Sequence, residues 1–236
     1  MPKSAVAAPP ATRERLALAL DTDDLVEALR LAGELEPWFG VAKVGLELFS
    51  AEGPSAVSAL LERGWEVFLD LKLHDIPNTV NKAARVLGAL GAGYLTLHAH
   101  GGVTMLRAGV EGLAEGARQA GLDPPVALAV TVLTSDNNAP PHILSKRVGV
   151  AIEAGCGGLV CAASDVREAK LLAPRFVAVV PGIRPEGSET HDQARASTPQ
   201  AALAAGADLL VVGRAVTAAP DRAAAAAALA ASVTGA

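Results

Sequence analysis

Residues Glu66–Thr79, with the sequence EVFLDLKLHDIPNT, form the stretch that decides the fold of this chain. The stretch begins as an apolar strand and reaches Pro77, a residue type favoured in the first turn of a helix. Side chains two residues apart on a strand share a face, so Asp70 and Lys72 are expected on one face and the flanking leucines on the other. Buried charges are costly unless paired, so the two residues are either a structural ion pair or part of a functional site.

The same succession of apolar strand and helix recurs on both sides of this stretch. The expected strands are Leu16–Asp21, Val41–Leu46, Glu66–Leu73, Tyr94–His100, Val126–Leu133, Gly158–Ala162, Phe176–Pro181 and Asp208–Gly213. The expected helices are residues 24–36, 54–63, 77–90, 104–120, 143–154, 165–173, 199–205 and 220–233. Continuous apolar strands separated by helices are typical of a parallel sheet covered by helices. Each strand–helix unit averages about 30 residues, in line with the βαβ unit.

Two architectures have this alternation, the doubly wound sheet and the closed barrel. Doubly wound sheets commonly bind dinucleotides through a glycine-rich first turn, whereas the first expected strand ends here in Asp21-Thr22-Asp23. The length of 236 residues is close to the roughly 250 that are typical of a (β/α)8 barrel. We therefore predict one (β/α)8 TIM barrel over residues 16–236, preceded by a flexible N-terminal tail, residues 1–15.

The composition argues against several classes of protein. The chain is 51% hydrophobic and has a net charge of −5, and it lacks the basic run and high pI expected of a nucleic-acid surface. No apolar run approaches the roughly 20 residues of a membrane span, and residues 1–12 lack the apolar core of a signal peptide. Cys156 and Cys161 are expected as small buried residues without a disulfide. We predict a cytoplasmic protein that binds neither nucleic acid nor membrane.

Charged side chains gather at the ends of the first three expected strands. These residues are Asp21, Lys43, Asp70 and Lys72. Active sites of barrels lie at the carboxyl ends of the strands, so two aspartates and two lysines on neighbouring strands should meet at one mouth. Such an alternation of acids and bases neutralises its own charge. The pattern predicts a catalytic site there.

Two arginines follow the last two expected strands. Strand seven runs into Pro181-Gly182-Ile183-Arg184, and strand eight runs into Gly213-Arg214. The loops after strands seven and eight of this fold recurrently bind phosphate, and arginine bonds phosphate oxygens in a bidentate manner. The intervening loop, residues 184–197, is long and polar, as expected of a flap over a ligand, and Gln193 is its best inward-pointing hydrogen-bonding residue. The alternative for each arginine alone is a solvated loop residue.

His98 and His100 lie two apart on an expected strand, where they could bind a metal ion. No carboxylate with suitable spacing accompanies them, and the ammonium groups of Lys43 and Lys72 would repel a cation. Packing or a supporting role is the preferred interpretation, and no metal is expected.

These motifs together resemble the orotidine 5′-phosphate decarboxylase family, type 1. The resemblance runs from Leu16 onward and rests on A-L-D at Asp21, K-V-G at Lys43, D-L-K-L-H-D-I-P-N-T at Asp70–Thr79, T-V-L-T-S at Thr131–Ser135, P-G-I-R at Arg184 and V-G-R at Arg214. It implies the decarboxylation of orotidine 5′-monophosphate to uridine 5′-monophosphate, the last step of de novo pyrimidine nucleotide synthesis. It also implies that no metal or organic cofactor takes part.

The resemblance also implies roles for the charged residues. Lys72 would stabilise the anion at C6 of the pyrimidine and then protonate it, and Asp70 would lie beside the substrate carboxylate. Lys43 would bridge Asp70 and the ribose, and Asp21 would accept a bond from a ribose hydroxyl. Thr134 would contact the base or the neighbouring wall of the site.

The remaining residues of the resemblance concern the phosphate and a second subunit. Arg184, Gln193, Gly213 and Arg214 would hold the phosphate and close the flap. Asp75 and Thr79 would reach the site of the other subunit of a homodimer. The alternative for Asp75 is an N-cap of the helix that begins near Pro77. The loop of residues 136–141 departs from the family pattern, so its contacts stay open.

Three other functions are compatible with parts of the pattern. A magnesium-dependent sugar-phosphate decarboxylase or aldolase-type synthase of the same superfamily would carry an acid where this chain has Lys43. A Schiff-base aldolase would need Lys72 deprotonated, and the flanking Asp70 and Asp75 oppose that. A non-catalytic barrel that binds a phosphate ligand would have no need of both lysines and both aspartates.

Overall fold

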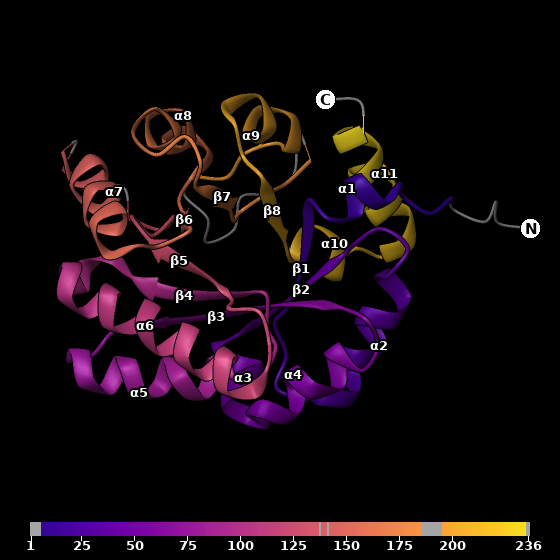
Figure 1. Cartoon of the computed structure of the whole chain (residues 1–236). Coiled ribbons are helices and arrows are strands. Elements are labelled where there is room, and N and C mark those ends of the chain that lie inside the picture. Colours follow the sequence, from indigo (N-terminus) through magenta and orange to yellow (C-terminus); the bar gives the residue numbers. More distant parts are fainter. Residues whose placement is uncertain (1–5, 137, 141, 186–194, 235–236) are drawn as a thin grey trace, which may run out of the picture.

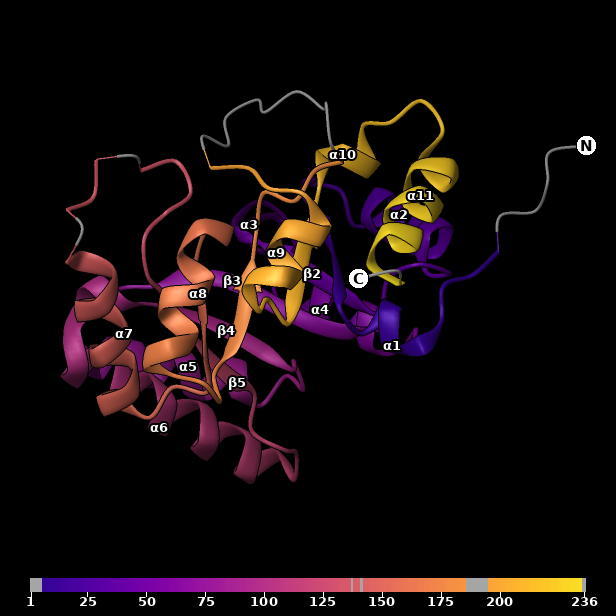
Figure 2. The same cartoon turned by 90° about the horizontal axis from the view of Figure 1, so that it is seen from above.

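The computed structural model describes residues 6–136, 138–140, 142–185 and 195–234. Eight parallel strands close into one barrel in the order β1-β2-β3-β4-β5-β6-β7-β8, with helices outside them (Figures 1 and 2). The strands are β1 Leu16–Leu20, β2 Val41–Gly45, β3 Glu66–Leu73, β4 Tyr94–His98, β5 Val126–Val130, β6 Gly158–Val160, β7 Val177–Val180 and β8 Leu209–Val212. The predicted single (β/α)8 barrel is confirmed.

The helices lie outside the barrel, and all but the first of them follow a strand. They are α1 Pro10–Arg13, α2 Leu25–Leu35, α3 Leu46–Glu52, α4 Pro54–Leu61, α5 Pro77–Gly88, α6 Gly102–Ala120, α7 Ile143–Ala154, α8 Ala163–Leu172, α9 Pro199–Ala205, α10 Arg214–Thr217 and α11 Arg222–Thr234. A short 3-10 helix, η1 Ala99–Gly101, precedes α6. In the described part of the chain, no helix combines the length and apolarity that crossing a membrane requires.

The predicted elements are all present, but several ends differ. β4 ends at His98 and β5 ends at Val130, short of the predicted His100 and Leu133. Beyond these points the chain leaves the sheet, so apolar residues such as Val132 and Leu133 do not belong to a strand. The short helices α3 and α10 were not predicted, because each lies in a connection and is too brief to show a helical period.

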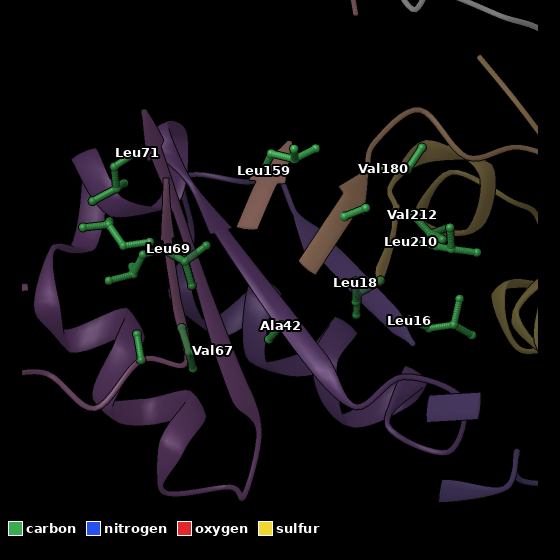
Figure 3. Close-up of a cluster of buried hydrophobic side chains, with 14 of the residues drawn as sticks. Leu16, Leu18, Ala42, Val67, Leu69, Leu71, Leu159, Val180, Leu210 and Val212 are labelled. Atoms are coloured by element: carbon green, nitrogen blue, oxygen red, sulfur yellow. The ribbon is translucent and has the colours of Figure 1, made fainter. Parts of the chain in front are cut away.

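Apolar side chains form two separate layers around the strands. The smaller layer fills the interior of the barrel and includes Ala19, Phe68 and Leu128. The larger layer packs between the strands and the helices (Figure 3). Figure 3 labels, from this outer layer, Leu16, Leu18, Ala42, Val67, Leu69, Leu71, Leu159, Val180, Leu210 and Val212. Each strand is thus apolar on both faces, which explains why its sequence reads as a continuous hydrophobic run.

Part of the segment predicted as a flexible tail packs against the barrel. Residues 10–13 form α1, which lies beside α11 (Figure 1). Trp38 Nε1 donates to the carbonyl oxygen of Val6 at 3.1 Å. The hydroxyl groups of Thr12 and Thr234 are 3.0 Å apart, and Thr12 is buried. The prediction of a free tail over residues 1–15 is therefore wrong from Val6 onward, because these contacts come from residues distant in sequence.

Helices α5 and α6 lie side by side and approach each other through glycines (Figure 1). A Cβ atom on Gly112 would overlap the carbonyl oxygen of Asn81, and one on Gly116 would overlap the carbonyl oxygen of Arg85. Both overlaps are with backbone atoms, which cannot turn aside as a side chain can. The absence of a side chain at these positions therefore sets the separation of the two helices.

The variant Gly116→Ala is expected to lower the free energy of unfolding by about 1 to 3 kcal/mol or more, because overpacking forces the backbone of the helices apart. The matched control is Gly149→Ala on α7, where an added Cβ has nothing within 4 Å. That change is expected to be neutral or to stabilise by about 0.5 to 1 kcal/mol, since alanine is the better helix former. Urea unfolding of both variants measures the difference. Equal stabilities would contradict the glycine contact between α5 and α6.

Candidate active site

The interior positions of the first three strands change from apolar to charged toward their carboxyl ends. On β1 the inward residue Ala19 is followed two positions later by Asp21. On β3 the inward residue Phe68 is followed by Asp70, and Lys43 pairs with Phe68 across β2 and β3. Because inward residues alternate along each strand, the charges lie directly above the apolar interior of the barrel.

A pocket at this end of the barrel brings most of the predicted site residues together. It is lined by Asp21, Lys43, Asp70, Lys72, Thr134, Arg184, Gly213 and Arg214. Apolar side chains form the rest of its wall, among them Phe68, Val130, Val160 and Val211. The pocket therefore combines a charged side on β1–β3 with an arginine-containing side after β7 and β8.

The four charged residues of β1–β3 form two ion pairs. Lys43 Nζ lies 2.9 Å from Asp21 Oδ1, and Lys72 Nζ lies 2.8 Å from Asp70 Oδ2. Lys43 is only 8% exposed, so Asp21 is the group that offsets the cost of burying its ammonium. The predicted bridge from Lys43 to Asp70 is not formed among the described residues, where Lys43 bonds Asp21 instead.

Gly45 makes room for the Lys43 side chain. A Cβ atom at Gly45 would lie 2.9 Å from Lys43 Nζ and 3.4 Å from Asp21 Oδ1. Any larger residue would therefore press on the ion pair. The glycine of the K-V-G motif serves the geometry of the site.

Lys72 has an unusual backbone. Its φ of 49° is the single positive value among the described residues other than glycine, and such a conformation costs about 1 to 3 kcal/mol for a residue with a side chain. The ladder between β3 and β4 pairs Leu69 with Leu95 and next pairs Leu73 with Leu97. Four steps along β3 thus match two along β4, so the ladder is interrupted by two extra residues of β3. The predicted alternation of faces is kept, because Leu71 packs in the outer layer with Leu69 while Asp70 and Lys72 line the pocket and bond each other.

Thr96 on β4 occupies the place where the ladder is interrupted. Its hydroxyl accepts the N–H of Lys72 at 2.8 Å and donates to Asp70 Oδ1 at 3.1 Å. Thr96 is fully buried. Sequence reasoning missed this residue, although a polar residue in the centre of the apolar run YLTLH was a usable signal.

Arg184 lies in the loop after β7 and Arg214 begins α10 just after β8, and both line the pocket. Burial, and next the positive charge of Arg214, lower the pKa of the Arg184 guanidinium. Within the part of the chain that the structure describes, Arg184 Nε is buried without a hydrogen-bond partner. Two guanidinium groups held near each other repel, and an anion between them removes that repulsion. The arrangement can bind a phosphate group.

Backbone contacts hold the two ends of the loop between β7 and α9 together. The N–H of Arg184 donates to the carbonyl oxygen of Ser197 at 2.9 Å, and Ile183 and Ser197 form an isolated parallel bridge. Gln193, predicted to point inward from this loop, lies outside the described residues. Its predicted contact with the phosphate therefore stays a prediction.

Arg195 joins this loop to the loop after β5. Its guanidinium donates to Asp165 Oδ2 at 2.8 Å and to the carbonyl oxygen of Leu133 at 3.0 Å. Leu133 directly precedes Thr134, which lines the pocket. Sequence reasoning missed Arg195, because an arginine in a polar loop carries no signal of the distant backbone carbonyl that it contacts.

Asp75 and Thr79 do not line the pocket of their own chain. Both are exposed, and Ile76 between them is 65% exposed. Asp75 Oδ1 accepts the N–H of Ile76 at 2.6 Å, whereas the N-cap of α5 is Ile76 without a side-chain bond. Asp75 is therefore not the N-cap of α5, and the alternative interpretation of this residue is wrong.

Three histidines form a cluster beside Lys72. The ring centroids of His74 and His98, and of His74 and His100, are 5.5 Å apart. Burial, and next the surrounding basic groups, lower the pKa of His98 to about 4, so His98 is neutral at physiological pH. In the described part of the chain, no three or more His, Cys, Asp or Glu residues converge as metal ligands do.

Cys156 and Cys161 are buried and free, as predicted. Cys161 lines the pocket. Burial raises the pKa of each thiol to about 12, so neither is a thiolate at physiological pH. The Cys161 side chain therefore contributes an apolar surface to the site.

Comparisons with known proteins point to one family. The model of the orotidine 5′-phosphate decarboxylase / HUMPS family matches residues 14–229. An orotidine 5′-phosphate decarboxylase of Anaeromyxobacter sp. (strain K) is 48% identical, over 92% of this chain and 97% of the relative. The corresponding protein of Moorella thermoacetica is 45% identical, over 94% and 92%. A crystal structure of orotidine 5′-phosphate decarboxylase from Lactobacillus acidophilus aligns with a TM-score of 0.79 and 33% identity, covering 93% of this chain and 99% of that one. The chain belongs to the orotidine 5′-phosphate decarboxylase / HUMPS family.

Proposed function

We propose that this chain decarboxylates orotidine 5′-monophosphate to uridine 5′-monophosphate without a metal or organic cofactor. The observation that carries the proposal is one pocket holding the Lys72–Asp70 pair on one side and Arg184 and Arg214 on the other. The substrate has a carboxylate on its base and a phosphate at its far end, which matches these two sides. Membership of the family, and the names of the relatives, support the same reaction.

Lys72 supplies the positive charge that the reaction requires. When the bond between C6 and the carboxylate breaks, the electron pair stays on C6, where the pyrimidine ring cannot readily delocalise it. A fixed ammonium beside C6 stabilises that charge in the transition state. Lys72 then transfers a proton from Nζ to C6 and regains one from solvent. CO2 leaves, and no other group in the site is oxidised or reduced.

Asp70 holds the Lys72 ammonium in place through the 2.8 Å bond. Both side chains are partly buried, with 16% of Asp70 and 32% of Lys72 exposed, so the pair is weakly screened by solvent. Asp70 also faces the position of the substrate carboxylate, where like charges repel.

The remaining pocket residues bind the parts of the substrate that do not react. Asp21 accepts a bond from a ribose hydroxyl, and Lys43, already paired with Asp21, donates to the ribose as well. Thr134 contacts the base from the loop after β5. Arg184 and Arg214, with Gly213 and Gln193, hold the phosphate. Binding energy from such a remote group can be used to order the site around the reacting atoms.

The proposal includes a homodimer in which Asp75 and Thr79 complete the partner's site. Two exposed side chains of the D-L-K-L-H-D-I-P-N-T motif that do not line the pocket of their own chain support this arrangement. The exposed side chain of Ile76 between them offers apolar surface for an interface. The cytoplasmic location also stays a prediction from the sequence.

Purified protein is expected to decarboxylate orotidine 5′-monophosphate at the same rate before and after incubation with EDTA. The loss of orotate absorbance and the release of CO2 measure the reaction. Inactivity with this substrate, or a metal requirement, would reject the proposal. Treatment with borohydride during turnover tests the Schiff-base alternative, because a covalent adduct on Lys72 would form only if that lysine attacked a carbonyl.

A further inference from the structure

Thr96 lies behind the Lys72–Asp70 pair and outside the pocket. It is on β4, fully buried, and is not among the residues that line the pocket. Its position faces the three residues of β3 at which the ladder is interrupted, between Leu69 and Leu73. A ligand in the pocket can therefore be affected by Thr96 only through other residues.

The directions of the two hydrogen bonds of Thr96 are fixed by its partners. The backbone N–H of Lys72 can only donate, so the Thr96 hydroxyl accepts that bond with its oxygen. Its own proton is then available to Asp70 Oδ1, which accepts it at 3.1 Å. One hydroxyl thus bonds the backbone of the lysine and the carboxylate of the aspartate at the same time.

The three residues form a closed loop of hydrogen bonds. Lys72 Nζ bonds Asp70 Oδ2, Thr96 bonds Asp70 Oδ1, and the Lys72 N–H bonds Thr96. Both oxygens of the carboxylate are thereby occupied, so the carboxylate cannot rotate without breaking a bond. The bond to the Lys72 N–H also satisfies a donor that the interrupted ladder leaves without its strand partner, at the residue with φ of 49°.

We propose that Thr96 is a positioning residue, whose single hydroxyl sets both the backbone of Lys72 and the carboxylate of Asp70 for the reaction. The expected effect of Thr96 on turnover rests on the proposed function. The positioning geometry does not rest on it, because the hydrogen bonds exist whatever the substrate is. Catalytic groups displaced by about 1 Å can lose about 100-fold in rate, so loss of this hydroxyl has a measurable effect.

The decisive variant is Thr96→Val, which keeps the shape of the side chain and removes the hydroxyl. We expect kcat to fall by about 10- to 100-fold, with the KM and the affinity for uridine 5′-monophosphate within about threefold of wild type, because the phosphate and ribose contacts are untouched. Thr96→Ser keeps the hydroxyl and is expected to retain kcat within about threefold.

The matched control is Thr131→Val, at the residue directly after β5. Thr131 is also fully buried, and its hydroxyl donates to the carbonyl oxygen of Val160 at 2.9 Å, with no bond to Asp70 or Lys72. A comparable loss of stability without a loss of kcat is expected. If Thr96→Val proves insoluble, the pair Thr96→Ser and Thr96→Ala gives the same comparison, since those variants differ by one oxygen atom.

A second readout is independent of activity. Hydrogen exchange at the Lys72 amide, followed by NMR, is expected to be slow in wild type and Thr96→Ser and faster in Thr96→Val, while other β3 amides are unchanged. Wild-type kcat in Thr96→Val, or equal kcat losses in Thr96→Val and Thr131→Val, would overturn the proposal. An inactive wild type with the expected exchange pattern would instead reject the proposed function and keep the positioning geometry.

Discussion

Replacing Lys72 by alanine is expected to reduce the turnover of orotidine 5′-monophosphate by more than about 10⁴-fold, because one side chain supplies both charge stabilisation and the proton. In the structure the Lys72 ammonium lies 2.8 Å from Asp70 at the charged side of the pocket. The substitution does not alter Arg184 and Arg214, which line the other side of the pocket and are proposed to hold the phosphate. Affinity for uridine 5′-monophosphate should therefore remain measurable.

Single-turnover assays at high enzyme concentration and calorimetric titration with uridine 5′-monophosphate test this expectation. The matched control is Lys146→Ala on α7, which removes an exposed lysine away from the pocket. It should retain wild-type turnover. Substantial residual activity in Lys72→Ala, with normal activity in the control, would remove Lys72 from the role of charge donor and proton donor.

Two inactive variants are expected to restore activity when they are combined in one dimer. The variants are Lys72→Ala, which lacks the proton donor, and Asp75→Asn, which lacks the carboxylate proposed to reach the partner's site. If Asp75 crosses the interface, one site of the mixed dimer carries both lesions and the other site carries none. Mixed dimers should then show about half of the wild-type activity.

Co-expression with two different affinity tags and sequential purification isolates the mixed dimers for assay. The matched control combines Lys72→Ala with Asp70→Asn. These two residues form a bond within one chain, so each site of that mixed dimer lacks one of them and should stay inactive. Absence of recovery with Asp75→Asn would show that Asp75 acts in its own subunit or outside the site. A monomeric wild-type protein would reject the composite site altogether.

Much of the candidate site could be predicted from local sequence. Asp21 directly follows β1, and Lys43 and Asp70 lie toward the carboxyl ends of β2 and β3, where barrel active sites lie; parallel strands in order bring them to one mouth. Arg184 and Arg214 were predicted beside the pocket by the same reasoning, and both line it. Three features suffice for this prediction: where each strand ends, which alternate residues of a strand face inward, and the order of the strands along the chain. All three can be recognised from short segments of the sequence.

The departures from prediction have a common origin in contacts between distant segments. The ladder between β3 and β4 is interrupted near Lys72, whose N–H bonds the Thr96 hydroxyl in place of a strand partner. Lys43 pairs with Asp21 alone among the described acidic groups, which depends on the space left by Gly45. Neither outcome changes the local periodicity of the sequence, so neither could be predicted from that periodicity.

The sequence by itself determined the barrel, the neighbourhood of the charges and the family resemblance, since each depends on the periodicity and spacing of residues close in the chain. The tertiary structure alone decided that Lys43 bonds Asp21 and not Asp70, and that Thr96 bonds both the Asp70 carboxylate and the backbone of Lys72. Those features depend on distances of a few ångströms between side chains on different strands, which are set only when the barrel closes.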